Sequence, residues 1–510
     1  MARVWRGLRD PRGWFCAVIA VVIVARSVAA QDLDGASGSV GSAEPAAPLL
    51  SASDSAVIDG LRIFTQETFG GNGRVCATCH PPTHNFTIDP AFIRKLPSTD
   101  PLFVSERDLN LRGLEQPKML RNFGLVRVNI DGFNVLPVSR AVPHLLGLSQ
   151  TISKGSTPLP RTHLLGWSGD GSPGDGSLRS FALGAVAQHL PRTLQRRGCA
   201  LADFDPAVCD YRVPTDAELD ALEQFQLFLG RQSEINIQPL SPRPNEMVFL
   251  DPFVEQGKAL FHSVRGGQNL SCNTCHANGG ANDRAGNGRL FPIGANRHPN
   301  MPACRLPGGN VPGDGGFSGQ PVSVESGQVL CRTAVDYDVT FRGKGQFNTP
   351  SIIEAADTPP FFHNNVVSTI ELAVAFYNTE VFARSAAAGG IPFNLLDLEV
   401  RKIAALLRTL NALNNMENGD RFNQLAQRVA ATSPQASTTA VEIAASETQD
   451  AIQVLTGGPV ALYPSTTVIS LLRRALAAEK QAIAAWNPSL LDQATSLKQS
   501  ARAQMVEIRP

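Results

Sequence analysis

The chain has 510 residues, and its 45 lysines and arginines balance its 45 aspartates and glutamates, so the formal net charge at pH 7 is zero. This balance gives no electrostatic reason to expect nucleic acid or an anionic surface as the partner. The length is sufficient for two or three domains.

Residues 1–30 have the three parts of a secretory signal: arginines, a short apolar run, and small residues before a cleavage point. The apolar run, residues 14–25, is too short to favour a membrane anchor. No other stretch is long and apolar enough to span a bilayer, so we expect a periplasmic protein with no transmembrane anchor once the signal is removed. Residues 31–50, rich in serine, glycine and alanine, are expected to be a flexible leader.

A cysteine motif occurs twice in the chain. A helix is expected over 53–68, and after it comes Cys76-Ala77-Thr78-Cys79-His80; the pattern recurs as Cys272-Asn273-Thr274-Cys275-His276. Two cysteines three apart, with histidine directly after them, form the attachment pattern of a c-type haem. Each thiol bonds to one vinyl group of the porphyrin, and the histidine is placed to take an axial position on the iron.

The motif has one other interpretation, a single zinc site built from both cysteine pairs. Nearly 200 residues separate the pairs, whereas about 15–20 residues separate them in common zinc modules. We therefore predict two covalently bound haems c. The attachment residues are Cys76, Cys79, Cys272 and Cys275, and the axial ligands are His80 and His276.

Helix signals place the two motifs in two domains. Thr215 and Glu218 form a capping box at the start of a helix that Gly230 ends, and this helix closes a first domain over 51–236. A proline-rich segment, residues 237–250, is the expected linker.

The second domain, expected over 251–415, repeats this plan. Asp251 as N-cap and Pro252 as first helical residue begin the helix before the motif, and a helix that ends near Asn414 closes the domain. Residues 416–510 form a helical C-terminal extension, either a cap over the haem domains or a partner-binding tail. The predicted fold is mainly α: two cytochrome c-like helical haem domains with long irregular loops, plus this extension.

Four cysteines remain when the signal and the two motifs are set aside. An even number of cysteines in an exported chain suggests disulfides, and pairing nearest neighbours gives Cys199–Cys209 and Cys304–Cys331. Buried free thiols are the alternative.

Further segments carry a resemblance to a known family. Beside the two motifs stand Phe347-Asn348-Thr349-Pro350-Ser351, Thr358-Pro359-Pro360-Phe361-Phe362-His363 and Thr369-Ile370-Glu371. Together they resemble the bacterial di-haem cytochrome c peroxidase superfamily, which also contains the di-haem enzyme that matures a tryptophan-derived cofactor, and the rubber oxygenases. The resemblance covers residues 253–413 well and the first domain in pieces, and it leaves out the leader and the extension.

The resemblance implies two haems with different tasks. The haem on His80 would react with peroxide or dioxygen, and the haem on His276 would relay electrons from a periplasmic donor. Trp167 matches the family tryptophan that lies between the haems. The backbone carbonyls of Thr358 and Pro360 match positions that hold a calcium ion between the domains, and Ca²⁺ accepts such oxygen ligands.

The chain departs from the family beside the first haem. The family peroxidases carry a glutamate where Pro191 stands here. His189, two residues earlier, is the candidate acid/base, because imidazole titrates near neutral pH; the alternative is a histidine that packs beside the pocket without moving a proton. This departure leaves a peroxidase, an oxidase and an oxygenase all open.

A second departure concerns the other iron. Tyr377 stands where the peroxidases carry an axial methionine, and the cofactor-maturing relatives also carry a tyrosine there. A phenolate is a hard anionic donor that favours ferric iron, so it would lower the reduction potential. In the alternative, Tyr377 packs on the closing helix, and His363 or Met301 is the ligand.

These residues favour an exported haem peroxidase or oxidase over two other classes. One is an electron-transfer di-haem cytochrome without peroxidatic activity, in which both irons are fully ligated. The other is a haem-containing scaffold or sensor whose helical extension binds a partner.

Overall fold

In the computed structural model, the described residues are 51–129, 132–134, 137–152, 165–167, 177–238, 245–281, 290–295, 311–312, 328–329, 347–463 and 467–509. Outside these ranges lie the signal and leader (residues 1–50), the expected disulfide Cys304–Cys331 and the ligand candidate Met301. The regular secondary structure of the described part is helical apart from pairs of short strands, so the predicted mainly-α class is confirmed. The cytochrome c-like character of the two domains stays a prediction.

The elements before the expected linker surround the first motif. The helices are α1 (Ala52–Gln66), α2 (Cys76–Cys79), α3 (Pro90–Ile93), α4 (Val104–Arg107), α5 (Pro117–Phe123), α6 (Leu148–Ile152), α7 (Leu178–His189) and α8 (Asp216–Phe228). Strand β1 (Leu125–Val128) pairs antiparallel with β2 (Val138–Ala141), and β3 (Gly198–Cys199) pairs in parallel with β4 (Tyr211–Arg212).

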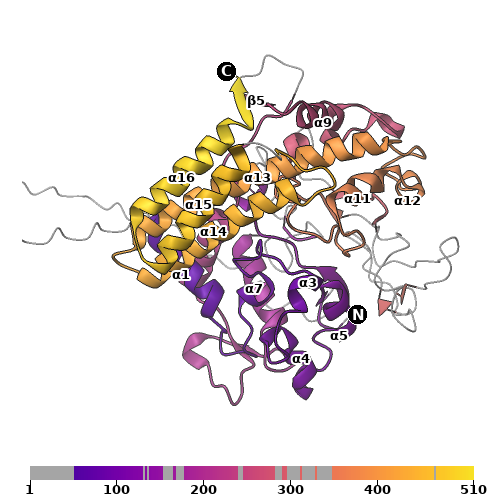
Figure 1. Cartoon of the computed structure of the whole chain (residues 1–510). Helices are drawn as coiled ribbons and strands as arrows, with labels where there is room; N and C mark the ends of the chain where they lie inside the picture. The colour runs from indigo at the N-terminus through magenta and orange to yellow at the C-terminus, as the bar shows by residue number, and fades with distance from the viewer. Residues whose placement is uncertain are drawn as a thin grey trace, which may run out of the picture. The chain divides into compact units, whose positions relative to one another are not determined.

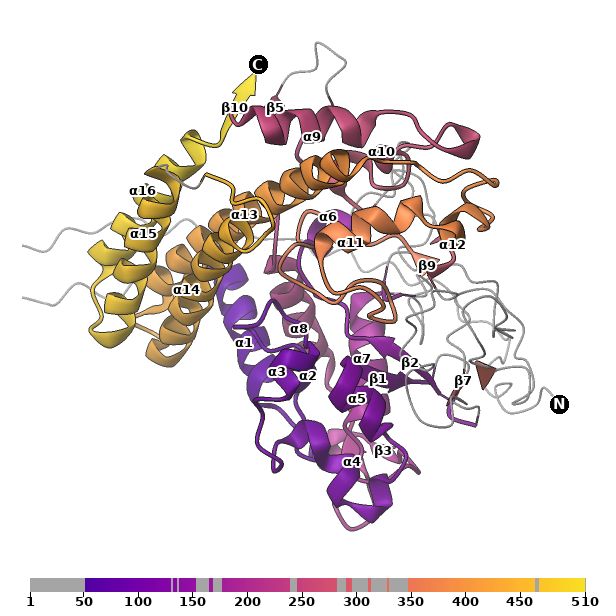
Figure 2. The same cartoon turned by 45° about the vertical axis from the view of Figure 1, so that its right-hand side comes forward.

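Helices α1 and α8 pack on one another, as Figure 2 shows. The predicted capping box starts α8: Thr215 Oγ1 accepts the Glu218 N–H, and the Glu218 carboxylate accepts the Thr215 N–H at 2.8 Å. Gly230 follows this helix with a φ of +69°, which favours glycine at this helix end. In the core between the two helices, the rings of Phe64 and Phe225 are 5.2 Å apart.

The elements after the linker surround the second motif and continue into the extension. The helices are α9 (Pro252–His262), α10 (Cys272–Cys275), α11 (Ile370–Ala375), α12 (Glu380–Ala383), α13 (Asp397–Val429), α14 (Pro434–Thr456), α15 (Thr467–Ala484) and α16 (Pro488–Ala503). Antiparallel pairs join β5 (Glu246–Phe249) to β10 (Val506–Arg509), β6 (Leu290–Phe291) to β9 (Phe347–Asn348), and β7 (Val311–Pro312) to β8 (Gln328–Val329).

Helix α9 begins as the sequence predicts and lies very close to α13. The Asp251 carboxylate accepts the Phe253 N–H at 2.8 Å, and Pro252 is the first helical residue. A Cβ on Gly257 would lie 2.1 Å from the Lys402 carbonyl oxygen, so only glycine permits this approach.

The closing helix of the second domain is longer than predicted. We expected it to end near Asn414, but α13 continues to Val429, so the expected boundary between 415 and 416 falls inside one helix. Two of its asparagines, Asn411 and Asn415, are buried and both donate to Asp357 Oδ2, at 2.9 and 2.8 Å. These contacts outweigh the low helix propensity of asparagine.

Asp357, Asn411 and Asn415 form a buried polar layer, and helix α14 adds two carboxylates to it. Glu447 is 2% exposed and accepts a hydrogen bond from Asn418, and Asp450 lies one turn farther along α14. Burial, together with repulsion from Asp357, raises the pKa of Asp450 to about 8 and the pKa of Glu447 well above its ordinary value. Burial also raises the pKa of Asp357, to about 6.

The layer makes stability depend on pH. Glu447 and Asp450 bind protons more tightly in the folded chain, so their stabilising effect is complete below the ordinary carboxylate pKa of about 4 and falls as pH rises. For Asp450 it is lost as pH rises through about 8. We expect the free energy of unfolding of the variant Glu447→Gln/Asp450→Asn to decrease less as pH rises. Its free energy of unfolding at pH 8 should exceed that of the wild type by at least about 1.4 kcal/mol, the value of one pKa unit.

Urea unfolding followed by circular dichroism from pH 5 to pH 9 measures this effect. Glu442 is exposed on the same helix, so Glu442→Gln is the matched control and should keep the wild-type slope. A double variant with the wild-type slope would contradict the prediction.

The extension packs into the cores of both cysteine-motif regions. Phe422, Leu425 and Val441 belong to the apolar cluster of α1 and α8, while Leu455 and Val468 belong to the cluster that contains α9 residues. In Figures 1 and 2, α13 to α16 run side by side, which agrees with their mutual contacts. The extension is therefore a cap that completes both cores.

Part of the expected linker is a paired strand. β5 lies within residues 237–250, and its Phe249 pairs with Val506 and its Glu246 with Arg509 on β10. Every helix in the described ranges is too short or too polar to cross a membrane.

A buried ion pair joins three helices of the cap. Lys498 Nζ on α16 lies 2.8 Å from Glu479 on α15 and 3.0 Å from Asp420 on α13, and the Lys498 and Glu479 side chains have no exposed surface. Burial lowers the pKa of Lys498, but the two carboxylates more than offset this and raise it above its ordinary value, so the lysine stays charged.

Removal of the lysine should therefore destabilise the fold. Lys498→Met leaves the Glu479 carboxylate buried without its cation, and we expect a loss of about 3–5 kcal/mol in the free energy of unfolding. Adding Glu479→Gln to this variant should recover part of the loss. Lys480→Met, at an exposed position of α15, is the control; an equal effect at both lysines in urea unfolding would refute the argument.

Candidate functional site

The two cysteine motifs fold into matching helical turns. In α2 and α10 the side-chain oxygens of Thr78 and Thr274 accept the backbone N–H three residues earlier, at 2.9 and 3.0 Å. The N–H of the following histidine donates to the carbonyl of the first cysteine, at 3.0 Å for His80 and 2.9 Å for His276. Because residues three apart share a helix face, both sulfurs of each motif lie on one side.

Each motif histidine is held in one tautomer by a backbone carbonyl. His80 Nδ1 is 2.8 Å from the Phe86 oxygen, and His276 Nδ1 is 3.0 Å from the Pro350 oxygen. A carbonyl only accepts, so Nδ1 carries the hydrogen and the Nε2 lone pair is available to a metal. Burial lowers the pKa of both histidines to about 4, which keeps them neutral.

The alternative zinc site finds no support in this geometry. Among the described residues, no three His, Cys, Asp or Glu side chains are grouped so that they could hold a metal ion. The two cysteine pairs therefore do not converge. Two separate sites, each with two sulfurs and one imidazole Nε2, have the donor set of two c-type haems.

The second motif faces a cavity of about 280 Å³. Apart from a few polar groups its wall is aliphatic and aromatic, as a flat apolar macrocycle requires. The candidate residues on this wall are Cys272, Cys275, His276, Trp167, His363, Tyr377, Thr358 and Pro360. The structure thus brings together the sequence-predicted residues of the second site that lie in the described ranges, and the calcium ligation by Thr358 and Pro360 stays a prediction.

Trp167 is hydrogen-bonded to one segment that precedes it in the sequence and to one that follows it. Its Nε1–H donates to the Ala141 carbonyl at 2.9 Å, and its own carbonyl accepts the Asn348 N–H at 2.8 Å. Its ring is 6.3 Å from that of His363, which stacks on Phe347 with centroids 3.5 Å apart. Trp167 is therefore fixed against both β2 and β9.

These bonds extend into a path between the two motif histidines. Thr87, next to Phe86, donates to the Val142 carbonyl at 2.6 Å, and Val142 follows Ala141. On the other side, Asn348 is two residues from Pro350. Hydrogen bonds and short covalent runs thus connect His80, Phe86, Thr87, Val142, Ala141, Trp167, Asn348, Thr349, Pro350 and His276.

The end of α7 is tied to the loop before the first motif. Asn72 donates from its side chain to the carbonyls of His189, at 2.9 Å, and Pro191, at 3.0 Å, and its N–H donates to the Leu190 carbonyl. A Cβ on Gly71 would lie 2.0 Å from the Leu190 oxygen, so this loop needs glycine at that position. His189 is thereby placed near the first motif.

His189 is neutral over the physiological pH range. Burial, followed by the charges of Arg74 and Arg196 and the nearby His80, lowers its pKa to about 3. Arg74 is itself 1% exposed and pairs with Glu115 at 2.9 Å. The expected acid/base role of His189 stays a prediction, but as a neutral imidazole rather than as a group that titrates near pH 7.

Tyr377 lies close to the second motif. It is part of the short 3-10 turn η9 (Phe376–Asn378), and its ring packs against Phe382 and Phe393, with centroids 4.9 and 5.6 Å apart. Burial, together with the nearby Cys275 and Cys272, raises the pKa of Tyr377 well above its ordinary value. Its role as an axial ligand stays a prediction.

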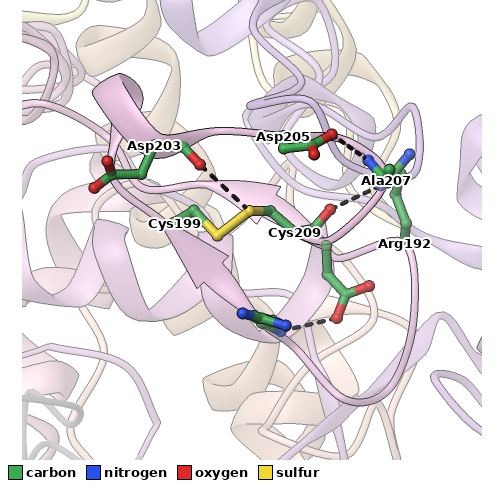
Figure 3. The surroundings of a disulfide bond; sticks show 8 residues. Arg192, Cys199, Asp203, Asp205, Ala207 and Cys209 are labelled. Atoms are coloured by element: carbon green, nitrogen blue, oxygen red, sulfur yellow. Dashed lines mark hydrogen bonds between the residues drawn. A yellow bond between two sulfur atoms is a disulfide. The ribbon is translucent and has the colours of Figure 1, made fainter.

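The predicted disulfide Cys199–Cys209 is confirmed (Figure 3). The Cys209 carbonyl accepts a hydrogen bond from the Arg192 side chain at 2.7 Å, and the Arg192 N–H donates to the Asp210 carbonyl at 3.0 Å. The disulfide loop thus also holds the segment that follows His189.

Two residues of the site were not identified from the sequence. His144 lines the cavity, and its Nδ1 accepts the Leu146 N–H at 3.3 Å, so its neutral ring carries the hydrogen on Nε2. Asn72 stands between glycines directly before the first motif, and this position could have indicated that its side chain holds another segment.

Comparison with protein-family models and with curated proteins gave no match.

Proposed function

We propose that the chain is an exported di-haem c-type oxidoreductase of the cytochrome c peroxidase type. Peroxide, or dioxygen, would react at the His80 motif, and electrons from a periplasmic donor would enter through the His276 motif. The observation that carries the proposal is the pair of matching turns, each with two cysteines on one face and a histidine whose Nε2 lone pair is available.

The four motif cysteines would hold the haems, and the Phe86 and Pro350 carbonyls orient the axial imidazoles. Haem iron would supply the redox chemistry, since it exchanges single electrons and binds small oxidants. Hydrogen peroxide would take up two electrons from donor proteins and two protons from water and leave as two water molecules. The apolar cavity wall would keep bulk water from the second haem.

Four other residues have roles in the proposal. Trp167 supports electron transfer, because it is the central residue of the bonded path between His80 and His276. Tyr377 is the proposed second ligand on the His276 side, and its place on the cavity wall near Cys272 and Cys275 supports this. The carbonyls of Thr358 and Pro360 are the proposed oxygen ligands of a calcium ion.

Haem content tests the proposal directly. Protein purified from the periplasm of a host that matures c-type cytochromes should give two haems per chain in an alkaline pyridine haemochrome assay. Cys272→Ser/Cys275→Ser should give one haem, and Cys199→Ser/Cys209→Ser, the matched control, should keep two. One haem or none in the wild type would overturn the proposal.

Ligand binding separates the enzyme from the alternative, an electron-transfer cytochrome. An enzyme of this type has an iron with an exchangeable position, so the ferric protein should bind azide rapidly and show a high-spin electron paramagnetic resonance signal. Two low-spin irons that do not bind azide would favour the electron carrier.

The bonded path gives an expectation for Trp167. Trp167→Phe keeps an aromatic ring but removes the hydrogen bond to Ala141, so both haems should remain while the electron-transfer step between them slows by about tenfold or more. Stopped-flow reduction measures this step. Phe181→Leu, which changes a ring elsewhere on the cavity wall, is the control and should leave the rate within about twofold; equal rates in wild type and Trp167→Phe would remove Trp167 from the path.

A further inference from the structure

The last two residues of α7 form a hydrogen-bonded pair. Gln188 Nε2 lies 2.9 Å from His189 Nε2, and Gln188 Oε1 accepts the backbone N–H of Asn129 at 3.2 Å. A backbone N–H can only donate, so it determines which end of the amide faces it. The amide NH₂ of Gln188 therefore faces the imidazole.

This arrangement fixes the tautomer of His189. Gln188 donates to Nε2, so Nε2 carries no hydrogen, and in a neutral ring the hydrogen is on Nδ1. Nδ1 is buried and has no hydrogen-bond partner among the described residues. A buried N–H without an acceptor is costly, and a ligand that accepts from it would remove this cost.

A comparison with the motif histidines shows that the hydrogen-bond partner of each ring determines whether its other nitrogen has a lone pair or is a donor. His80 and His276 face backbone carbonyls, so each has an Nε2 lone pair for a metal. His189 faces an amide N–H, so it has a hydrogen-bond donor, and the Asn72 bonds hold it beside the loop of the first motif.

We propose that Gln188 is a positioning residue, which holds His189 in the tautomer that donates from Nδ1 to a small oxidant or anion bound at the first haem. The inference rests on the proposed function. It adds which group would donate a hydrogen bond to the small ligand at the first haem. The charged or titratable groups that act on His189 are Arg74, Arg196 and His80.

Azide binding to the ferric holoprotein tests the role of Gln188. In Gln188→Glu the carboxylate accepts a hydrogen from Nε2, so the neutral ring loses its Nδ1 hydrogen. Azide affinity at pH 8 should fall by roughly three- to tenfold, which is the effect of one hydrogen bond. The new carboxylate also favours the imidazolium, so affinity should recover as pH falls toward 5, with a slope that the wild type lacks.

Two further variants complete the test. Gln188→Met removes the amide with little change in size and should weaken azide binding without adding the pH dependence. Gln195→Glu makes the same charge change at an exposed position six residues after His189 and should match the wild type. Azide curves for Gln188→Glu and Gln188→Met that match those of Gln195→Glu would overturn the inference, while two haems per chain would leave the proposed function standing. Protein without haem would overturn both.

Discussion

The candidate site depends on one interaction, the hydrogen bond from a motif imidazole to a backbone carbonyl. The two sites make this bond in different ways. His80 reaches a carbonyl six residues away, within the loop of its own motif, whereas His276 reaches one 74 residues away. The first ring is thus oriented by local structure, and the second is oriented only when the segment that contains Pro350 is in place.

The structure fixes that distant segment with buried polar contacts. Directly after Pro350, Ser351 donates to the Glu354 carboxylate, which also pairs with Arg231 at 3.1 Å, and the Arg231 and Glu354 side chains are 3% and 0% exposed. Farther along, Asp357 accepts from two asparagines of α13. Buried groups of this kind are costly when one partner is lost, so they specify a single position for the segment.

Local signals in the sequence predicted local structure well. The capping box of α8, the start of α9 and the disulfide Cys199–Cys209 all depend on residues close together in the chain, and all three are confirmed. The end of α13 was predicted wrongly, because the asparagines that suggest a helix end have partners such as Asp357, 54 residues away. The candidate residues of the second site came from motifs and resemblance, but the bonded path through Trp167 and the pairing of Gln188 with His189 depend on contacts that have no sequence pattern.

The pairing of β5 with β10 has a consequence for the order of folding. Phe249 precedes the second motif, and its partner Val506 lies more than 250 residues later. The core of α1 and α8 likewise includes Phe422 and Val441. Closing such long loops costs entropy before any contact is gained, and high contact order slows folding. While the chain is being synthesised, both cysteine motifs therefore emerge well before the segments that complete their cores. For that interval the motif thiols belong to a chain whose cores are still incomplete. In the proposed function, this is the state in which the haems would be attached.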